Sequence, residues 1–216
     1  LVDLRHRLEY ALLMLLVGIV RLMPLDTAAR ISARIWGLVA PRLRRHQRAL
    51  ENLATAYPEK TPAEREAIAR AMWENLGRVM AETMQIDRRI RVANDRVFRR
   101  YKDKLGPAIG CSLHMGNWEL AIWPLVVAGA NPAAVYRTVK NPYVDAFLRH
   151  QRRDLYPGGL LGKGKVDGNW EEGQRTARQI TDFVRHGGRL GLVCDLYDKG
   201  GLPVPFFGRD ARSVMI

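Results

Sequence analysis

AIGCSLHMGNWEL, residues 108–120, joins a short apolar run to an apolar helix through a turn that contains glycine. The run 108–113 has the composition of a buried strand, and Asn117 can cap a helix that extends to Ala128. A strand, a turn and a helix in this order are typical of α/β folds. The stretch therefore predicts the first unit of such a fold.

The alternation of strand and helix continues beyond this stretch. The sequence predicts strands at 133–136, 190–194 and 204–207, and helices at 141–155 and 170–185. This order predicts an α/β protein with a mainly parallel, twisted sheet flanked by helices. The glycine-rich segment 159–166 carries Val166 where a nucleotide-binding loop needs Ser or Thr, so a substrate-facing loop is predicted there instead.

The first part of the chain is predicted to be helical. Asp26 or Thr27 can cap a helix that ends before Pro41. Thr61-Pro62-Ala63-Glu64 has the composition of a capping box with proline at the first helical position, and apolar residues at helical spacing follow it. The pattern predicts an N-terminal helical extension at residues 1–60, ahead of an α/β domain at residues 61–216.

Positive charge is concentrated in the N-terminal half. The formal net charge is +13; residues 1–105 hold 21 Lys and Arg against 12 Asp and Glu, whereas residues 106–216 hold 14 against 10. Basic charge beside the apolar segment 10–20 favours an anionic membrane surface as partner, and the sequence has no nucleic-acid-binding signature. The segment is shorter than the ~20 residues that span a bilayer. We expect it to lie in the membrane interface, with a signal peptide or a buried core helix as alternatives.

His114 and Glu119 stand on either side of the predicted turn. On one continuous helix they would point about 140° apart, but a turn in which Gly116 adopts positive φ allows the two side chains to converge. A histidine paired in this way can take a proton from a hydroxyl, while the carboxylate fixes its tautomer. The N–H groups around Gly116 and Asn117 can bind an oxyanion or a phosphate. The alternative is an ordinary helix entry with a surface acid.

Arg137 and Asp195 each follow a predicted strand, as His114 does. Ligands bind at the carboxyl ends of strands in open α/β sheets, so both are candidate substrate-binding residues. Arg137 can hold a phosphate or a carbonyl oxygen, whereas Asp195 can orient His114, bind sugar hydroxyls or pair with Arg137. The basic run 149–153 predicts a solvated helix face, with contact to an acidic carrier protein or lipid headgroups as the alternative. The histidines show no paired spacing, so neither a metal nor a cofactor is predicted.

HMGNWEL at residues 114–120 resembles the H-x4-D/E signature of membrane-associated acyltransferases. In the form H-x-G-N-W-E it is similar to the bacterial lipid A biosynthesis acyltransferases, together with the phosphatidylinositol mannoside acyltransferases. Further stretches resemble this family in the same order along the chain: Arg44-Arg45 through Asn52-Leu53, Tyr57-Pro58-Glu59, Asn75-Leu76-Gly77-Arg78 with Glu82, Tyr136-Arg137 with Asn141-Pro142, Asp195, and Val204-Pro205-Phe206-Phe207-Gly208. Family members continue beyond the last stretch, so we expect the chain to be truncated at its C-terminus.

The resemblance implies an enzyme that transfers a fatty acyl chain from acyl carrier protein or acyl-CoA to a hydroxyl of a glycolipid such as a lipid A precursor. His114 and Glu119 are then the expected catalytic residues. The expected substrate-binding residues are Gly116, Asn117, Arg137 and Asp195. The expected location is the cytoplasmic face of the bacterial inner membrane, with peripheral or monotopic attachment. Two alternatives remain open: a phosphatidylinositol mannoside acyltransferase, and a catalytically silent membrane-binding protein.

Overall fold

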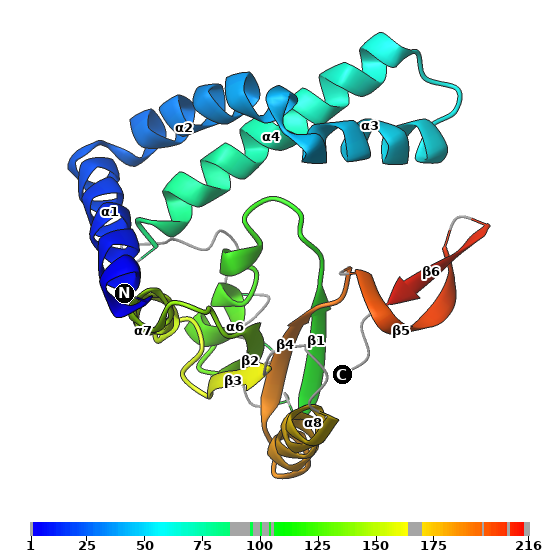
Figure 1. The fold of residues 1–216 in the computed structure, drawn as a ribbon. Helices are drawn as coiled ribbons and strands as arrows, with labels where there is room; N and C mark the ends of the chain where they lie inside the picture. The colour runs from blue at the N-terminus through cyan, green and yellow to red at the C-terminus, as the bar shows by residue number, and fades with distance from the viewer. Residues whose placement is uncertain are drawn as a thin grey trace. The chain divides into compact units, whose positions relative to one another are not determined.

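The computed structural model describes residues 2–86, 106–163, 170–195, 197–206 and 208–213, together with residues 96, 100 and 104. The chain forms two compact units, one of residues 12–88 and one of residues 1–11 with 89–216. Figure 1 labels their helices and strands. These units differ from the predicted division at residue 60, because the helix that follows Thr61 packs on the helices before it.

The helical unit contains the second half of α1 (Val2–Leu22), then α2 (Leu25–Val39), a short 3-10 helix (Ala40–Arg42), α3 (Arg44–Ala56) and α4 (Pro62–Thr83). The predicted capping box at the start of α4 is confirmed. The Glu64 backbone N–H donates to the Thr61 hydroxyl at 3.3 Å, and the Thr61 backbone N–H donates to the Glu64 carboxylate at 2.7 Å. The predicted cap at Asp26 or Thr27 is wrong, because α2 begins at Leu25 with Pro24 in the N-cap position, so both residues lie inside the helix.

Helices α2 and α4 approach each other through small residues. The buried face of α2 consists of Ala28, Ala29, Ala33 and Gly37. A Cβ atom added to Gly77 of α4 would lie 2.6 Å from the carbonyl oxygen of Ser32, so only glycine allows this backbone approach. Three aliphatic side chains of α2, those of Ile31, Ile35 and Leu38, are instead exposed. The contact between α2 and α4 therefore buries small residues, while these aliphatic side chains stay at the surface.

A hydrogen-bonded histidine connects α3 to α4. The Trp73 indole N–H donates to Nδ1 of His46 at 3.1 Å, and Nε2 of His46 lies 2.9 Å from the Glu66 carboxylate. Because Nδ1 accepts a hydrogen bond, the proton of the neutral ring belongs on Nε2, where the carboxylate accepts it. Both His46 and Trp73 are buried. The network fixes the orientation of the Trp73 ring.

The other unit is built on a parallel sheet, as predicted. Its strands β1 (Ala108–Ser112), β2 (Pro132–Arg137), β3 (Gly159–Lys163) and β4 (Arg189–Val193) lie in the order β1-β4-β2-β3. Buried residues of the sheet pack with Ile180 of α8 (Trp170–Arg185) to form its core. The prediction of a substrate-facing loop at 159–166 is wrong for its first part, because residues 159–163 form β3; residues 164–169 lie outside the described part.

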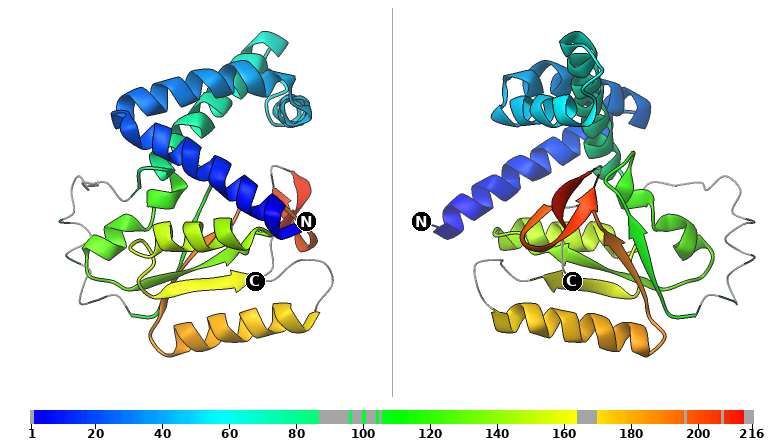
Figure 2. Two further views of the ribbon diagram at one scale, coloured as in Figure 1. Left: turned by 60° about the vertical axis from the view of Figure 1, so that its left-hand side comes forward. Right: turned by 90° about the vertical axis from the view of Figure 1, so that its right-hand side faces the viewer.

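Helices cover both faces of this sheet. In the order β1-β4-β2-β3, the connections from β1 to β2 and from β2 to β3 cross the sheet toward the β3 edge. The connection from β3 to β4 crosses it in the opposite direction. Right-handed crossovers then place the intervening helices on opposite faces. Figure 2 shows this arrangement for α7 (Pro142–Arg152) and α8. The predicted helix at 170–185 is confirmed with the same bounds.

The predicted continuous helix at 117–128 is divided. A 3-10 helix, η2 (Trp118–Leu120), comes first, and α6 (Trp123–Val127) follows. Pro124 explains the break, since it has no N–H to donate to the carbonyl of Leu120 and its ring would clash there. The same proline is tolerated in the first turn of α6.

An antiparallel hairpin of β5 (Tyr197–Phe206) and β6 (Arg209–Ser213) follows the sheet. The predicted strand at 204–207 falls within its first arm up to Phe206, and Phe207 lies outside the described residues. The last strand of the parallel sheet is thus β4, whose end leads directly to Asp195.

Gly77→Ala should destabilise the helical unit by roughly 1–3 kcal/mol, the usual cost of forcing extra volume into a packed contact. Gly18→Ala is the matched control, because a Cβ atom on Gly18 of α1 meets nothing within 4 Å. Alanine should stabilise that helix by roughly 0.5–1 kcal/mol. Urea unfolding followed by circular dichroism measures both. Equal stability of the Gly77→Ala protein and the parent would contradict the close helix approach.

Candidate active site

The order of the sheet brings His114 and Asp195 together. They follow β1 and β4, which are parallel neighbours, so both strands end at the same edge. The His114 backbone N–H donates to Oδ2 of Asp195 at 2.8 Å, and Nδ1 of the ring lies 2.7 Å from Oδ1. About a third of each side chain is exposed, 33% for His114 and 34% for Asp195. The pair is therefore fixed in geometry yet open to a substrate.

The electrostatics of the pair assign the proton on the imidazole. Partial burial by itself would raise the pKa of Asp195, but the hydrogen bonds from His114 outweigh it and hold this pKa below its usual value. An ionised carboxylate only accepts hydrogen bonds, so Nδ1 of His114 must be the donor. The lone pair of the neutral ring then belongs to Nε2. Of the three roles predicted for Asp195, orientation of His114 is the one that this contact matches.

Glu119 has a different partner from His114. Its carboxylate accepts two hydrogen bonds from Arg152 of α7: one from Nε at 2.9 Å and one from Nη2. Glu119 is 10% exposed in its side chain and Arg152 23%. Burial raises the pKa of nearby Tyr156 to about 12, and the negative charge of Glu119 adds to the effect. Glu119 was predicted to converge on His114, but its carboxylate instead forms a largely buried ion pair with Arg152.

Arg152 is a site residue that the sequence interpretation missed. It belongs to the basic run 149–153, which was predicted to be a solvated helix face. Arg153 fits that prediction, since 70% of its side chain is exposed. The sequence of a basic run does not predict which of its side chains is buried. The buried acid that selects Arg152 lies 33 positions earlier in the sequence.

The turn itself has the predicted backbone. Gly116 has a φ of +54°, in the left-handed region that favours glycine. Asn117 occupies the N-cap position of η2. Trp118 places its ring edge-on to the imidazole of His114, with the centroids 5.0 Å apart. The imidazole of His114 therefore contacts both Trp118 of the turn and Asp195.

Arg137 is the last residue of β2 and lies at the same edge of the sheet. Its side chain is exposed, and within the described residues it has no hydrogen bond or ion pair. The pairing of β2 with β4 covers only Pro132, Ala133 and Ala134, so Arg137 lies beyond it. The structure thus brings His114 and Asp195 into contact and leaves Arg137 available at the edge.

Asn141 joins the start of α7 to the start of α1. Its side-chain oxygen accepts hydrogen bonds from the backbone N–H groups of Tyr143 and Val144, which caps α7. Its amide nitrogen donates to the carbonyl oxygen of His6 at 2.8 Å and to Glu9 at 3.0 Å. One buried amide thus caps α7 and links it to the first turns of α1, which gives a structural role to the Asn141-Pro142 motif.

These observations define the class of protein: a parallel α/β protein with an oriented histidine at the carboxyl edge of its sheet. A family model described as bacterial lipid A biosynthesis acyltransferase matches residues 3–215, nearly the whole chain. The chain therefore belongs to this family, and the family implies an acyltransferase. A search of curated proteins found no significant match.

Glu119→Gln should lower the free energy of unfolding by roughly 2–3 kcal/mol, because it leaves Arg152 partly buried without an ionised partner. Adding Arg152→Met should recover part of the loss, since the double variant has no unpaired charge at this place. Arg153→Met is the control at the exposed C-cap of α7, and it should change little. Urea unfolding of the four proteins measures these effects. A Glu119→Gln protein as stable as the parent would contradict the buried pair.

Proposed function

We propose that the protein transfers a fatty acyl chain from an acyl thioester to a hydroxyl group of a glycolipid. The proposed acceptor is a lipid A precursor, and the proposed donor is acyl carrier protein or CoA. The observation that carries the proposal is the His114–Asp195 contact within a chain of this family. An oriented imidazole with an available Nε2 is what the activation of a hydroxyl nucleophile requires.

In the first step, Nε2 of His114 takes the proton of the acceptor hydroxyl as its oxygen attacks the thioester carbonyl carbon. A C–O bond forms, and the carbonyl electron pair moves to its oxygen. The imidazole becomes an imidazolium, which the Asp195 carboxylate stabilises through Nδ1–H. The charge of Asp195 therefore lowers the free energy of the transition state.

In the second step, the oxyanion reforms the carbonyl and the C–S bond breaks. The departing sulfur takes the proton from Nε2 of His114, which returns the ring to its neutral form. The products are an ester and a free thiol, so atoms and charge balance without any further reactant. Direct attack by the acceptor requires no acyl-enzyme.

Three residues near His114 are proposed to bind the substrate. Arg137 can place two parallel N–H groups on a phosphate or carbonyl oxygen. The backbone N–H groups of Gly116 and Asn117 in the turn are proposed to stabilise the negative charge that develops on the thioester oxygen. Glu119 is proposed to act through Arg152, by holding the turn in place.

His114→Ala should lower turnover by roughly 10²-fold or more, the usual scale for loss of a positioned general base, while the protein stays folded. Asp195→Asn should lower kcat more than it changes KM, because the lost charge acts mainly in the transition state. Asp154→Asn removes one exposed carboxylate from the turn after α7 and is the control. The measurement is transfer of a labelled acyl chain. Near-parental turnover in a folded His114→Ala protein would rule out the mechanism.

The same assay separates the candidate substrates. Acyl carrier protein and CoA thioesters are each offered with a lipid A precursor and with a phosphatidylinositol mannoside. Our proposal predicts the highest kcat/KM for the lipid A precursor. Preference for the mannoside with acyl-CoA would assign the chain to the alternative reaction, and vesicle binding without any turnover would support a silent binding protein.

We further propose that the protein acts on the cytoplasmic face of the bacterial inner membrane, where α1 lies in the interface. Along α1, exposed aliphatic side chains recur at helical spacing: Leu4, Leu8, Leu12, Leu15, Ile19 and Leu22. They form one apolar face, whereas Val17 and Val20 are buried. Among the described residues, no helix has both the length and the apolar character to cross a bilayer. An apolar helix face beside basic residues favours a helix that lies parallel to the membrane surface, which is the placement proposed for α1.

Leu15→Ser should weaken binding to anionic vesicles by roughly tenfold or more, because burial of one leucine in the membrane contributes roughly 1.5–3 kcal/mol. Leu202→Ser in β5 is the matched control, since its exposure is nearly the same: 61% against 62%. Binding of the parent protein should also weaken as salt screens its basic charge. Co-sedimentation with vesicles measures each effect. Equal loss in the two variants would contradict the placement of α1.

A further inference from the structure

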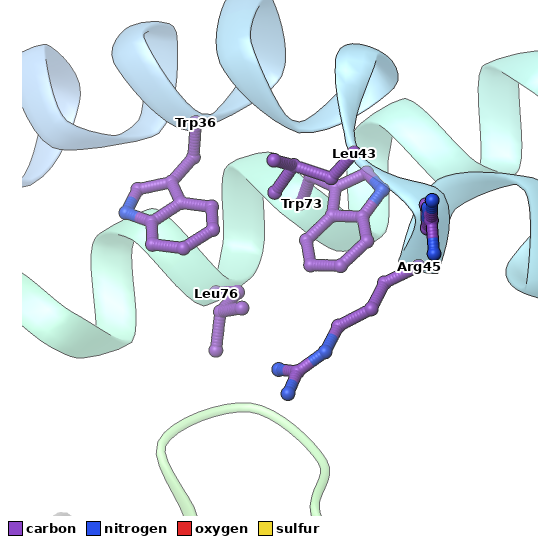
Figure 3. A pocket seen from close by; sticks show the side chains of 6 residues that line it. Trp36, Leu43, Arg45, Trp73 and Leu76 are labelled. Atoms are coloured by element: carbon purple, nitrogen blue, oxygen red, sulfur yellow. The ribbon is translucent and has the colours of Figure 1, made fainter.

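The helical unit contains a pocket of about 300 Å³ lined by Trp36, Leu43, Arg44, Arg45, Trp73 and Leu76. Figure 3 shows Trp36 on α2, Trp73 and Leu76 on α4, and Leu43 and Arg45 at the corner between α2 and α3. The two indole rings are nearly parallel, with 12° between their planes and 6.0 Å between their centroids. The pocket is about twice the size of a ~150 Å³ cavity that holds a benzene ring. It can therefore accept part of a small molecule.

The lining combines apolar walls with positive charge. The indole N–H of Trp73 is already bonded to His46, so this ring offers the pocket mainly its apolar surface. Arg44 and Arg45 are exposed and, within the described residues, neither guanidinium has a hydrogen bond or ion pair. They form the first turn of α3, where the N-terminal N–H groups add further positive potential. The positive charges of the two arginines are repelled by the positive end of the helix dipole. A bound anion would reduce this repulsion.

We propose that this pocket binds an anionic phospholipid of the membrane surface, with its phosphate on Arg44 and Arg45 and its glycerol and first methylenes against the indoles. The site belongs to the helical unit and does not rest on the chemistry of His114. Arginine suits phosphate because its planar fork donates two parallel hydrogen bonds. The aromatic and leucine walls require that the anion carry an apolar part.

The surroundings favour a membrane lipid over another phosphate compound. The corner of residues 38–45 exposes aliphatic Leu38, Val39 and Leu43 in the same short segment as the two arginines. Leu38 is 65% exposed, although it is a large aliphatic residue. Apolar side chains beside arginines are typical of segments that enter the headgroup region of an anionic bilayer. A pocket at this corner would meet lipid headgroups directly.

The test uses the full chain and monomeric dihexanoylphosphatidylglycerol below its critical micelle concentration, so that binding to a bilayer does not contribute. Isothermal titration calorimetry should show saturable binding, at least tenfold tighter than that of neutral dihexanoylphosphatidylcholine. The double variant Arg44→Gln/Arg45→Gln should bind phosphatidylglycerol at least tenfold more weakly. Arg34→Gln/Arg48→Gln is the matched control, since it removes the same charge from exposed positions of α2 and α3 outside the pocket.

Trp36→Ala tests the apolar wall and keeps the Trp73–His46 bond. In a protein whose circular dichroism is unchanged, it should weaken phosphatidylglycerol binding, and unchanged affinity would overturn the proposal. The proposal is likewise overturned by an absence of saturable binding, by equal affinity for the neutral lipid, or by equal loss in the two double variants. Displacement of the lipid by 4′-phosphopantetheine at similar concentration would assign the pocket to the acyl donor instead.

Discussion

Two hydrogen bonds from His114 to the carboxylate of Asp195 hold the proposed catalytic centre together. They join residues 81 positions apart, and they form because β4 lies beside β1 with both carboxyl ends at one edge. The backbone bond fixes the turn after β1, while the ring bond fixes the imidazole and its tautomer. The orientation of the proposed base therefore depends on the strand order of the whole sheet. The glycine turn alone would leave the ring free to rotate.

The two carboxylates near His114 differ because their environments differ. Asp195 is partly exposed and hydrogen-bonded to the imidazole, so it can stabilise a proton that arrives during the reaction. Glu119 is buried and already neutralised by Arg152. A buried pair of this kind adds little net stability, but removal of either charge is costly. This difference supports the proposed roles, in which Glu119 of the H-x4-E motif holds the turn and Asp195 stabilises the imidazolium.

Local patterns in the sequence predicted the turn, the α/β class and the positive φ of Gly116, because these depend on neighbouring residues. They predicted Glu119 as the partner of His114, whereas the ring contacts Asp195, because adjacency of β4 to β1 is a property of the sheet order that local patterns do not show. Arg152 was missed for a similar reason: its acid lies on a distant segment. Strand β3 was taken for a loop because Gly159 and Gly162 are poor strand formers, although parallel pairing with β2 accommodates them. The break at Pro124 was readable from sequence, since proline cannot donate within a helix.

The position of the proton on His114 tests the central claim most directly. Nitrogen NMR of ¹⁵N-histidine-labelled protein, with His114→Gln to assign the signals, reports the tautomer of the neutral ring. Our account predicts a protonated Nδ1 donating to Asp195 and an unprotonated Nε2, with this preference lost in Asp195→Asn. A neutral ring that carries its proton on Nε2 in the parent protein would contradict the account, because that nitrogen could then take no proton from a hydroxyl.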